Sequence, residues 1–473
     1  MIIGRQEELR SIQEAYESKY SEFVAVYGRR RIGKTYLVRE AFDYQFTFQH
    51  AGLAKEGMKK QLAAFKNSLV EAGLTGYNTP KDWLEAFNGL KALIRSSRKK
   101  KKVIFLDEAA WMDTPKSGFL SALENFWNNW ASARKDVLLI ICASATSWII
   151  KKVFKNKGGL HNRVTYKIPL SPFTLKECEQ YAQMRGLRLN RYQIVNLYMV
   201  MGGVALYWSL LDKRYSAVQY IDALFFNPKA KLKGDFDELY DSLFNNPEPY
   251  KEIIYALGKN NKGLTRQELI DGGTVKDNGA ITLKLKELEE CGFIIKAPDF
   301  PKTKKNTIYK LVDNYTIFYF KYIQDNEEVE GFWSSAGGGQ SMRSWCGLAF
   351  ERVCLQHVSQ IKRALGFPMV ATRQHAWRSD PAKLEDGESG VQIDLLIDRN
   401  DNIINLCEMK WASDEYVIDK KYDAELRHKA DVFARQTGTR KAVHLTMVTT
   451  YGVKHNIYYD DFQSQVTMDQ LFD

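Results

Sequence analysis

Long hydrophobic runs and closely spaced cysteines are both absent from this chain of 473 residues. Its longest apolar run, Val137 to Ala143, has the length of a strand and is far too short to span a bilayer. The six cysteines are scattered and no pair has the spacing of a metal finger, so we expect reduced thiols. The N-terminus turns polar after three residues, unlike a signal peptide. The sequence therefore predicts a cytoplasmic protein with no membrane partner.

Acidic residues are fewer than basic ones, since 57 Asp and Glu stand against 68 Lys and Arg, and the net charge is +11. A modest basic excess fits a polyanion such as DNA, and a basic protein without a nucleic-acid partner is the alternative. The composition is otherwise globular, with 45% hydrophobic and 26% charged residues. The length indicates more than one hydrophobic core.

Three regions follow one another along the chain. Residues 1 to about 235 alternate short apolar runs with amphipathic stretches, which predicts an α/β domain with a parallel sheet; from about 171 the pattern becomes helical, as in a lid. Residues 236–325 form a helix-rich block that ends in a hairpin pattern. The segment 326–340 contains three consecutive glycines and is interpreted as a linker, and residues 341–473 form a second α/β block.

A complete phosphate-binding loop lies between the apolar strand 23–27 and a helical stretch. It matches G-x-x-x-x-G-K-S/T, in which glycines let backbone N–H groups face phosphate oxygens at a helix N-terminus. Lys34 is expected to reach the β- and γ-phosphates, and Thr35 to hold Mg²⁺ through its hydroxyl. The three arginines of the loop are expected to point outward, toward DNA, a neighbouring subunit or solvent. The predicted ATP-binding residues here are Gly28, Arg29, Arg30, Arg31, Ile32, Gly33, Lys34, Thr35 and Tyr36.

A carboxylate pair follows the buried strand 103–106 and completes the predicted nucleotide site. Asp107 at the strand tip is expected to hold the magnesium ion through water, and Glu108 to orient or deprotonate the attacking water. Two acids after an apolar run are also common in solvated loops, but a P-loop in the same chain favours the functional interpretation. Glu108 and Lys34 are thus predicted catalytic residues.

With these motifs the chain resembles the AAA+ superfamily, and within it the prokaryotic ATPases related to the STAND and origin-recognition branches, which occur mainly in archaea. The resemblance extends over nearly the whole chain, because many of these ATPases continue into a winged helix and a nuclease-like domain. The resemblance implies an ATPase that binds ATP and Mg²⁺. It also allows the chain to form a homo-oligomer.

The resemblance also implies roles for residues outside the P-loop. Gly4 and Arg5 match a GRxxE box beside the adenine, and Ser144 matches a catalytic sensor position at the γ-phosphate or the water. Arg163 matches an arginine finger or sensor, and an ordinary surface residue is the alternative. Whether a finger at this position would act on the nucleotide of its own subunit or of a neighbouring one stays open. Ala205 stands where the lid motif of the family has proline, which puts the lid's nucleotide contact in doubt.

The middle block has the pattern of a winged helix-turn-helix. A capping box begins at Thr265, a second helix covers 279–290, and strands 293–296 and 307–311 form a hairpin. The second helix would enter a major groove and the hairpin tip would lie on phosphates, unless the block serves only for protein contacts. The predicted DNA-binding residues are Lys284, Lys286, Lys302, Lys304 and Lys305.

The C-terminal block carries acids on two apolar strands in a pattern suited to a divalent metal. Asp394 lies on the strand 393–397, and Glu408 and Lys410 share one face of the strand 403–410 because they are two residues apart. Carboxylates that hold Mg²⁺ or Mn²⁺ beside an ammonium suit phosphodiester hydrolysis, and an exposed strand with alternating charges is the alternative. The spacing resembles the PD-(D/E)xK nuclease superfamily, which implies Glu351 on an upstream helix as a third metal ligand and Lys410 as a catalytic residue.

Two functions from different classes follow. In the first, ATP binding and hydrolysis control DNA binding and metal-dependent DNA cleavage. In the second, the chain is a nucleotide-dependent switch whose nuclease-like domain is inactive and only binds nucleic acid or a partner. A third function, an ATP-regulated transcription factor, would require a defined operator sequence.

Overall fold

The computed structural model describes residues 2–144, 146–155, 159–244, 246–273, 280–298, 300, 307–326, 329–336 and 339–473. Contacts between residues divide the chain into two compact units, Met1–Pro172 with Glu238–Pro247, and Phe173–Asp237 with Glu248–Asp473. The helical stretch 173–237, which the sequence analysis assigns to the ATPase domain, groups with the second unit. The domain boundaries at 235, 325 and 340 stay predictions. Within the described ranges, no helix combines the length and the apolar character that crossing a bilayer needs.

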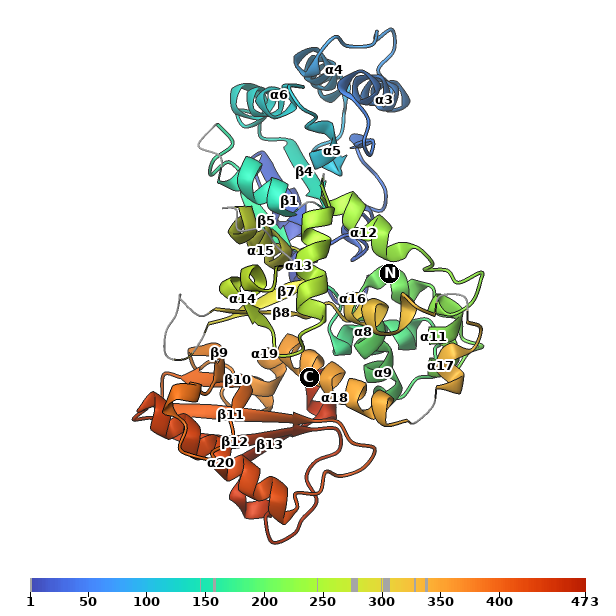
Figure 1. The fold of residues 1–473 in the computed structure, drawn as a ribbon. Helices are drawn as coiled ribbons and strands as arrows, with labels where there is room; N and C mark the ends of the chain where they lie inside the picture. The colour runs from blue at the N-terminus through green and yellow to red at the C-terminus, as the bar shows by residue number, and fades with distance from the viewer. Residues whose placement is uncertain are drawn as a thin grey trace. The chain divides into compact units, whose positions relative to one another are not determined.

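The first unit is built on a parallel sheet whose strand order is β2-β3-β4-β1-β5 (Figure 1). β4 lies in the centre and is buried along its whole length, as expected for a continuous apolar run in a parallel sheet. This sheet confirms the predicted α/β class with a parallel P-loop core. The strands are β1 (Glu22–Tyr27), β2 (Phe48–Ala51), β3 (Lys102–Asp107), β4 (Val137–Ala143) and β5 (Tyr166–Pro169).

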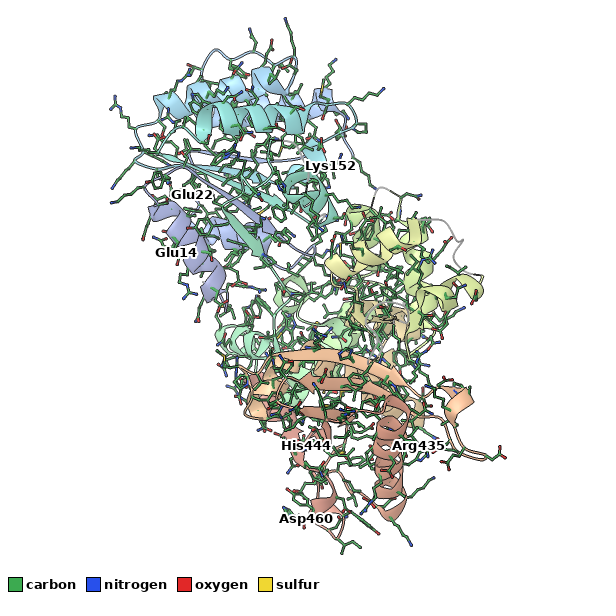
Figure 2. All side chains as sticks on the ribbon, turned by 90° about the vertical axis from the view of Figure 1, so that its left-hand side faces the viewer. Glu14, Glu22, Lys152, Arg435, His444 and Asp460 are labelled. Carbon is green, nitrogen blue, oxygen red and sulfur yellow. The ribbon has the colours of Figure 1, made fainter. Side chains whose placement is uncertain are left out.

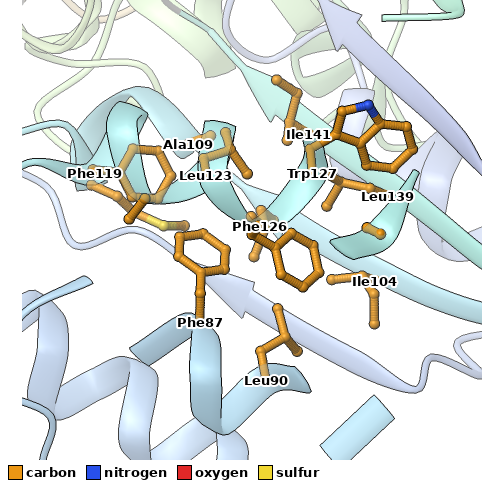
Figure 3. Packing of buried hydrophobic residues seen from close by; sticks show 14 of the residues in the cluster. Phe87, Leu90, Ile104, Ala109, Phe119, Leu123, Phe126, Trp127, Leu139 and Ile141 are labelled. Carbon is orange, nitrogen blue, oxygen red and sulfur yellow. The ribbon is translucent and has the colours of Figure 1, made fainter. Parts of the chain in front are cut away.

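Helices cover both faces of this sheet, because each parallel crossover must pass over one face. On one face Phe87 of α4 and Phe126 of α6 stack at 5.2 Å in the same cluster as Ile104 (Figure 3). On the other face Leu37 of α2 packs in a cluster with Ile140. The helices are α1 (Gln6–Glu17), α2 (Lys34–Ala41), α3 (Met58–Glu71), α4 (Trp83–Ser96), α5 (Ala109–Met112), α6 (Phe119–Phe126) and α7 (Thr146–Trp148), with π-helical turns at Trp127–Ala131 and Ile149–Phe154.

The second unit begins with the helices that the sequence analysis interprets as a lid. Capping boxes at Thr174, Asn190 and Ser216 begin three of them. α9 has buried residues on almost every side and therefore lies at the centre of this helical group. The helices are α8 (Leu175–Met184), α9 (Arg191–Met201), α10 (Ala205–Ser209) and α11 (Ala217–Phe225). The next helix along the chain, α12 (Asp235–Leu243), begins in the second unit and continues into the first.

The middle block combines three helices with a three-stranded sheet of order β6-β8-β7, whose paired strands are antiparallel. The predicted capping box at Thr265 is present, and the second predicted helix and the hairpin lie where they were expected. The tip lysines Lys302, Lys304 and Lys305 lie outside the described residues. The elements are α13 (Glu248–Gly258), β6 (Leu264–Thr265), α14 (Arg266–Asp271), α15 (Ala280–Glu290), β7 (Ile294–Ala297) and β8 (Ile308–Leu311).

The glycine-rich segment 326–340 carries more structure than a linker. It contains α17 (Phe332–Ser335), whose Trp333 is buried against Phe318 of α16 (Asn314–Phe318) and against Trp345. The backbone N–H groups of Trp333 and Ser334 donate to the Asp222 carboxylate of α11. Aromatic packing therefore holds this segment on the helices, which its glycine content does not reveal.

The C-terminal block is a mixed sheet of order β13-β12-β11-β10-β9, in which β9, β10 and β11 are antiparallel and β11, β12 and β13 are parallel (Figure 1). Phe433 of α20 packs on Trp377 of β9. Arg435 of the same helix, labelled in Figure 2, forms an ion pair with Glu388. The elements are α18 (Gln340–Gln356), α19 (Val358–Ala364), β9 (Thr372–Arg378), β10 (Gln392–Arg399), β11 (Ile403–Lys410), α20 (Lys420–Thr437), β12 (Ala442–Thr449) and β13 (Ser464–Thr467).

Candidate functional site

The predicted phosphate loop connects β1 to α2 and has the backbone that such a loop needs. Gly28 and Gly33 have φ of 144° and 93°, in the region that favours glycine. A Cβ on Gly28 would lie 2.2 Å from the Leu170 carbonyl oxygen, so no other residue fits there. Lys34 is buried, and its ammonium donates to the carbonyl oxygens of Gly28 (3.0 Å) and Arg29 (2.8 Å). The loop and its lysine therefore form one hydrogen-bonded unit.

The two predicted magnesium residues lie side by side. The Thr35 hydroxyl donates to Asp107 Oδ2 at 2.8 Å, although 72 residues separate them. Burial raises the pKa of Asp107 above its usual value, while the hydrogen bond from Thr35 acts in the opposite direction. A hydroxyl and a carboxylate at the mouth of a P-loop are the oxygen donors that Mg²⁺ prefers, so these residues fit that ion.

The predicted base and the predicted sensor also meet. Glu108 Oε2 accepts hydrogen bonds from the Ser144 hydroxyl (2.7 Å) and from the Ser144 backbone N–H (3.1 Å). Glu108 has a positive φ of 45°, which lets the chain turn directly after β3. The ends of the neighbouring strands β3 and β4 thus bring a carboxylate and a hydroxyl together at the edge of the sheet where the P-loop begins.

The arginines of the loop differ from the expectation that all three point outward. Arg29 is only 5% exposed, so its side chain is not a solvated loop charge. The neighbouring Gly28 is closely approached by the Leu170 carbonyl oxygen. Arg31 forms an ion pair with Glu238 at 3.3 Å, whereas Arg30 is half-buried. Ile32 is buried and Tyr36 is exposed at the start of α2.

The structure also describes the residues to which the family resemblance assigns roles. Gly4 and Arg5 both have positive φ, and Arg5 donates to the Ser171 carbonyl oxygen at 2.6 Å. Arg163 is exposed, as both a finger and a surface residue would be. In the second unit a Cβ on Gly203 would lie 1.8 Å from the Phe173 carbonyl oxygen, so the Gly-Gly motif serves close packing there. Their roles at the nucleotide stay predictions.

The predicted acids of the C-terminal sheet share one face. Leu395 of β10 pairs with Cys407 of the antiparallel strand β11, and continuing this register by one residue places Asp394 opposite Glu408. Lys410 lies on the same face, with its ammonium 3.9 Å from Glu408. Burial raises the pKa of Glu351 on α18 to about 7, and the Asp394 carboxylate adds to that effect, which places Glu351 beside the strands. The geometry brings all four predicted residues into one region.

Three further side chains belong to this region, and the sequence analysis missed them. Lys310 of β8 forms an ion pair with Asp394. Burial alone would raise the pKa of Asp394, but the ammonium of Lys310 outweighs it and holds the pKa below its usual value. Lys429 of α20 donates to Glu408 at 2.8 Å, and the Tyr422 hydroxyl donates to the same carboxylate at 3.2 Å. No spacing signal marks these residues, because each reaches the acids through tertiary packing.

Oxygen ligands are present in this region, but their arrangement is not that of a preformed metal centre. Across the described ranges, no group of three or more His, Cys, Asp or Glu side chains is placed to hold a metal ion. The carboxylates of Asp394 and Glu408 face ammonium groups instead. Their donor chemistry fits Mg²⁺ or Mn²⁺, provided that the ammonium groups are displaced.

The predicted DNA-binding lysines of α15 lie on its polar side. Lys284 is half-buried and Lys286 is exposed, with an ion pair to Glu290 at 3.8 Å. Ile281, Leu285 and Leu288 are buried on the opposite side, as the predicted helical period requires. DNA contact by this helix stays a prediction.

Comparison with known proteins gives a family for the N-terminal part. Residues 2–204 match a protein family described as an ATPase domain predominantly from Archaea. The match confirms the predicted ATPase domain, and the P-loop described above lies within it.

Three proteins from archaea are among those similar to this chain. The uncharacterized protein MJECL04 of Methanocaldococcus jannaschii is 26% identical over 425 residues, which cover 87% of this chain and 88% of that protein. Among solved structures, the Walker-type ATPase PABY2304 of Pyrococcus abyssi is 16% identical with a TM-score of 0.48, over 67% of this chain and 95% of that chain. The ORC2 protein of Aeropyrum pernix is 12% identical with a TM-score of 0.42, over 69% of this chain and 94% of that chain.

Proposed function

Starting from an ATPase domain over residues 2–204, we propose that this chain hydrolyses ATP and uses its nucleotide state to control DNA binding and metal-dependent DNA cleavage. The observation that carries the ATPase part is the pair of contacts at the strand ends, Thr35 with Asp107 and Glu108 with Ser144. These contacts join residues that three separate segments of the chain supply. Their roles are those of a nucleotide-hydrolysing site.

At the ATPase site, each residue has a separate task. The backbone N–H groups of the loop and the N-terminus of α2 bind the phosphates, and the Lys34 ammonium exchanges its loop carbonyl partners for phosphate oxygens. Thr35 and Asp107 would hold Mg²⁺, which would neutralise negative charge on the phosphates. Glu108 orients the attacking water and takes its proton, and Ser144 fixes the carboxylate for that task.

The middle block is proposed to bind DNA as a winged helix. Support comes from the two helices α14 and α15 followed by the hairpin β7–β8, with lysines on the exposed side of α15. α15 would enter the major groove, and the tip lysines would contact phosphates. The net charge of +11 favours such a polyanion.

The C-terminal sheet is proposed to be the cleaving element. Asp394, Glu408 and Glu351 would hold Mg²⁺ or Mn²⁺, which polarises a phosphodiester and activates water when bound. Lys410 lies next to Glu408 and would stabilise the charge that develops on the phosphate. The convergence of these residues supports the proposal, since an exposed strand with alternating charges would not place Glu351 beside them.

A switch without cleavage is the second candidate, and the ammonium partners of Asp394 and Glu408 favour it. The test is a plasmid-cleavage assay with Mg²⁺ or Mn²⁺, with and without ATP, on wild type, Asp394→Ala and Lys34→Ala. Cleavage that Asp394→Ala abolishes and Lys34→Ala makes independent of ATP supports the nuclease. If the protein hydrolyses ATP but cleaves no DNA under any of these conditions, the nuclease proposal fails and the switch is the remaining candidate.

A further inference from the structure

The contact between Lys310 and Asp394 joins two blocks of the second unit. Lys310 lies on β8 of the middle block, 84 residues before its partner on β10. The lysine is 6% exposed, and Asp394 also accepts a hydrogen bond at 2.9 Å from the Gln392 amide. A lysine at this depth is rare without a charge partner. Both contacts are made to Oδ1, so the ammonium supplies the positive charge that this carboxylate would otherwise receive from a bound cation.

The neighbouring carboxylate has a cation of its own. Lys429 donates to Glu408 at 2.8 Å. Burial by itself would lower the pKa of this lysine, but the Glu408 carboxylate has the larger effect and raises it above its usual value. Lys410 is farther from Glu408, at 3.9 Å. In this state two single positive charges therefore balance two acids that lie opposite each other on β10 and β11.

Two cavities adjoin Asp394 and Lys310, and the middle block forms part of the wall of both. The smaller, of about 30 Å³, is also lined by Glu351 and by Gly258 at the end of α13. Such a volume holds about two water molecules. The larger, of about 280 Å³, is lined by β7 and β8 of the middle block and by His375 of the C-terminal sheet. The Asp394 carboxylate thus lies where the middle block meets the sheet.

Further contacts hold the middle block in this position. Arg378 of β9 donates to the carbonyl oxygens of Lys262 (2.7 Å) and Gly263 (2.5 Å), and it forms an ion pair with Glu268 at 3.3 Å. A third tie is a hydrogen bond of 3.1 Å between His375 of β9 and the Pro298 carbonyl oxygen. The partners on the middle block lie before β6, on α14 and after β7, so the block is fixed at several points.

We propose that the middle block is an intramolecular inhibitor of the acid site, in which the Lys310 ammonium holds the place of a divalent cation at Asp394. The inference rests on the proposed metal-dependent function of that site. A divalent cation that replaces this ammonium requires that Lys310, and with it β8, move away from Asp394. The same block that is proposed to bind DNA thus keeps Asp394 paired until it moves.

The test is calorimetric titration of Mn²⁺ into the full-length, nucleotide-free protein. Lys310→Met removes the ammonium and keeps the shape of the side chain, whereas Lys310→Arg keeps the charge. Lys296→Met is the matched control, because it removes an exposed lysine from the partner strand of the same hairpin. Each variant is also titrated with Asp394→Asn added, so that only Asp394-dependent binding is counted.

Lys310→Met should bind Mn²⁺ about tenfold more tightly than wild type, because the cation no longer has to break a buried ion pair. Lys310→Arg and Lys296→Met should behave as wild type. Should Lys310→Met fail to fold, Arg378→Ala releases the second tie without touching the acids, and a change in the same direction is expected.

Equal Mn²⁺ affinity in wild type, Lys310→Met and Arg378→Ala would overturn the inhibitor and leave the metal site intact. No Asp394-dependent binding in any of these variants would overturn the metal site itself, and the inhibitor with it. Plasmid cleavage under the same conditions gives a second readout, and greater cleavage by Lys310→Met than by Lys296→Met is expected.

Discussion

At the scale of single residues, Lys34 is held by the loop that it is proposed to serve. Its ammonium binds two loop carbonyl oxygens, so its position is set before any phosphate arrives. A preset donor loses little conformational entropy when its ligand binds. The neighbouring residues Thr35 and Glu108 are likewise fixed by partners from other strands.

Lys34→Ala is expected to weaken ATP binding at least about tenfold, because it removes a charge-assisted contact to the β- and γ-phosphates. Hydrolysis should fall to background. Binding of a fluorescent ATP analogue and release of phosphate measure the two effects. Lys100→Ala, which removes an exposed lysine, is the control and should leave both unchanged. Full ATPase activity of Lys34→Ala would refute the P-loop assignment.

Glu108→Gln is expected to separate binding from turnover. The glutamine carbonyl can still accept the hydrogen bond from Ser144, so ATP should bind as in wild type, while loss of the base should slow hydrolysis about 100-fold. The two assays named above check this expectation. A normal rate of hydrolysis would show that Glu108 does not activate the water.

His357 gives a pH dependence that can be worked out from its surroundings. Its Nδ1 donates to the Val353 carbonyl oxygen and its Nε2 accepts from the Leu175 N–H, so the ring is neutral. Burial lowers its pKa from 6.5 to about 4. The unfolded chain therefore binds the proton first, and the stability contributed by this residue is complete above pH 6.5 and is lost as the pH falls toward 4.

This loss should reach about 3 kcal/mol for the one residue. Thermal unfolding measured across this pH range should show a smaller acid-induced drop in Tm for His357→Gln than for wild type. His161→Gln, which changes an exposed histidine, should keep the drop of the wild type. An NMR titration in which the His357 ring takes up its proton near pH 6.5 would contradict the expectation.

At the scale of elements, the middle block has two faces with different tasks. β8 sends Lys310 toward the C-terminal sheet, whereas the exposed side of α15 carries Lys286. The hairpin therefore contributes to the acid site through one strand, while its tip is proposed to contact DNA. A change at the tip should affect DNA affinity without affecting the acids.

Replacing Lys302, Lys304 and Lys305 together with alanine should weaken DNA binding for all sequences alike. The slope of log affinity against log salt should become smaller by about 2 to 3, because three phosphate contacts are lost. Fluorescence anisotropy with duplex DNA at several salt concentrations measures this slope. The triple control Lys55→Ala, Lys59→Ala and Lys60→Ala removes the same charge from exposed positions of the first unit. Equal slopes in the two triple variants would remove the tip from the interface.

The elements themselves could be predicted well where apolar runs are continuous. The predicted strand 137–143 is β4 and the predicted strand 403–410 is β11, because a run of buried residues marks a strand along its full length. The partners of Asp394 and Glu408 could not be predicted. Lys310 and Lys429 look like ordinary polar positions of a strand and a helix, and only packing between distant segments brings them to the acids.

The burial of Arg29 in the P-loop could not be predicted from the sequence either. Arg29 lies in a glycine-containing loop, and such loops are usually at the surface. Arg29 is nevertheless only 5% exposed, and Leu170 of the segment that follows β5 lies close to the neighbouring Gly28. The motif predicts which residues meet the phosphates, but it does not predict what covers the loop.

At the scale of the whole molecule, the proposed ATPase is expected to act as an oligomer in which Arg163 reaches the nucleotide of a neighbouring subunit. Its exposure permits this role. Lys34→Ala and Arg163→Ala should each be inactive alone. An equal mixture should regain about a quarter of the wild-type rate, because a working site needs an intact Lys34 next to a neighbour with an intact Arg163.

The mixing experiment is read by phosphate release after the two variants have been denatured and refolded together. Arg163→Ala mixed with wild type serves as the control for dilution. Full activity of Arg163→Ala alone would leave the arginine as a surface residue. An inactive mixture of two folded variants would assign Arg163 to its own subunit.

The ion pair between Arg31 and Glu238 has a consequence for synthesis on the ribosome. The last strand of the first sheet ends at Pro169, so 69 further residues (238 − 169) are added before Glu238 exists. At about 5 to 20 residues per second this takes roughly 3 to 14 seconds. A nascent first unit therefore has all strands of its sheet available for several seconds before the partner of its phosphate loop is made.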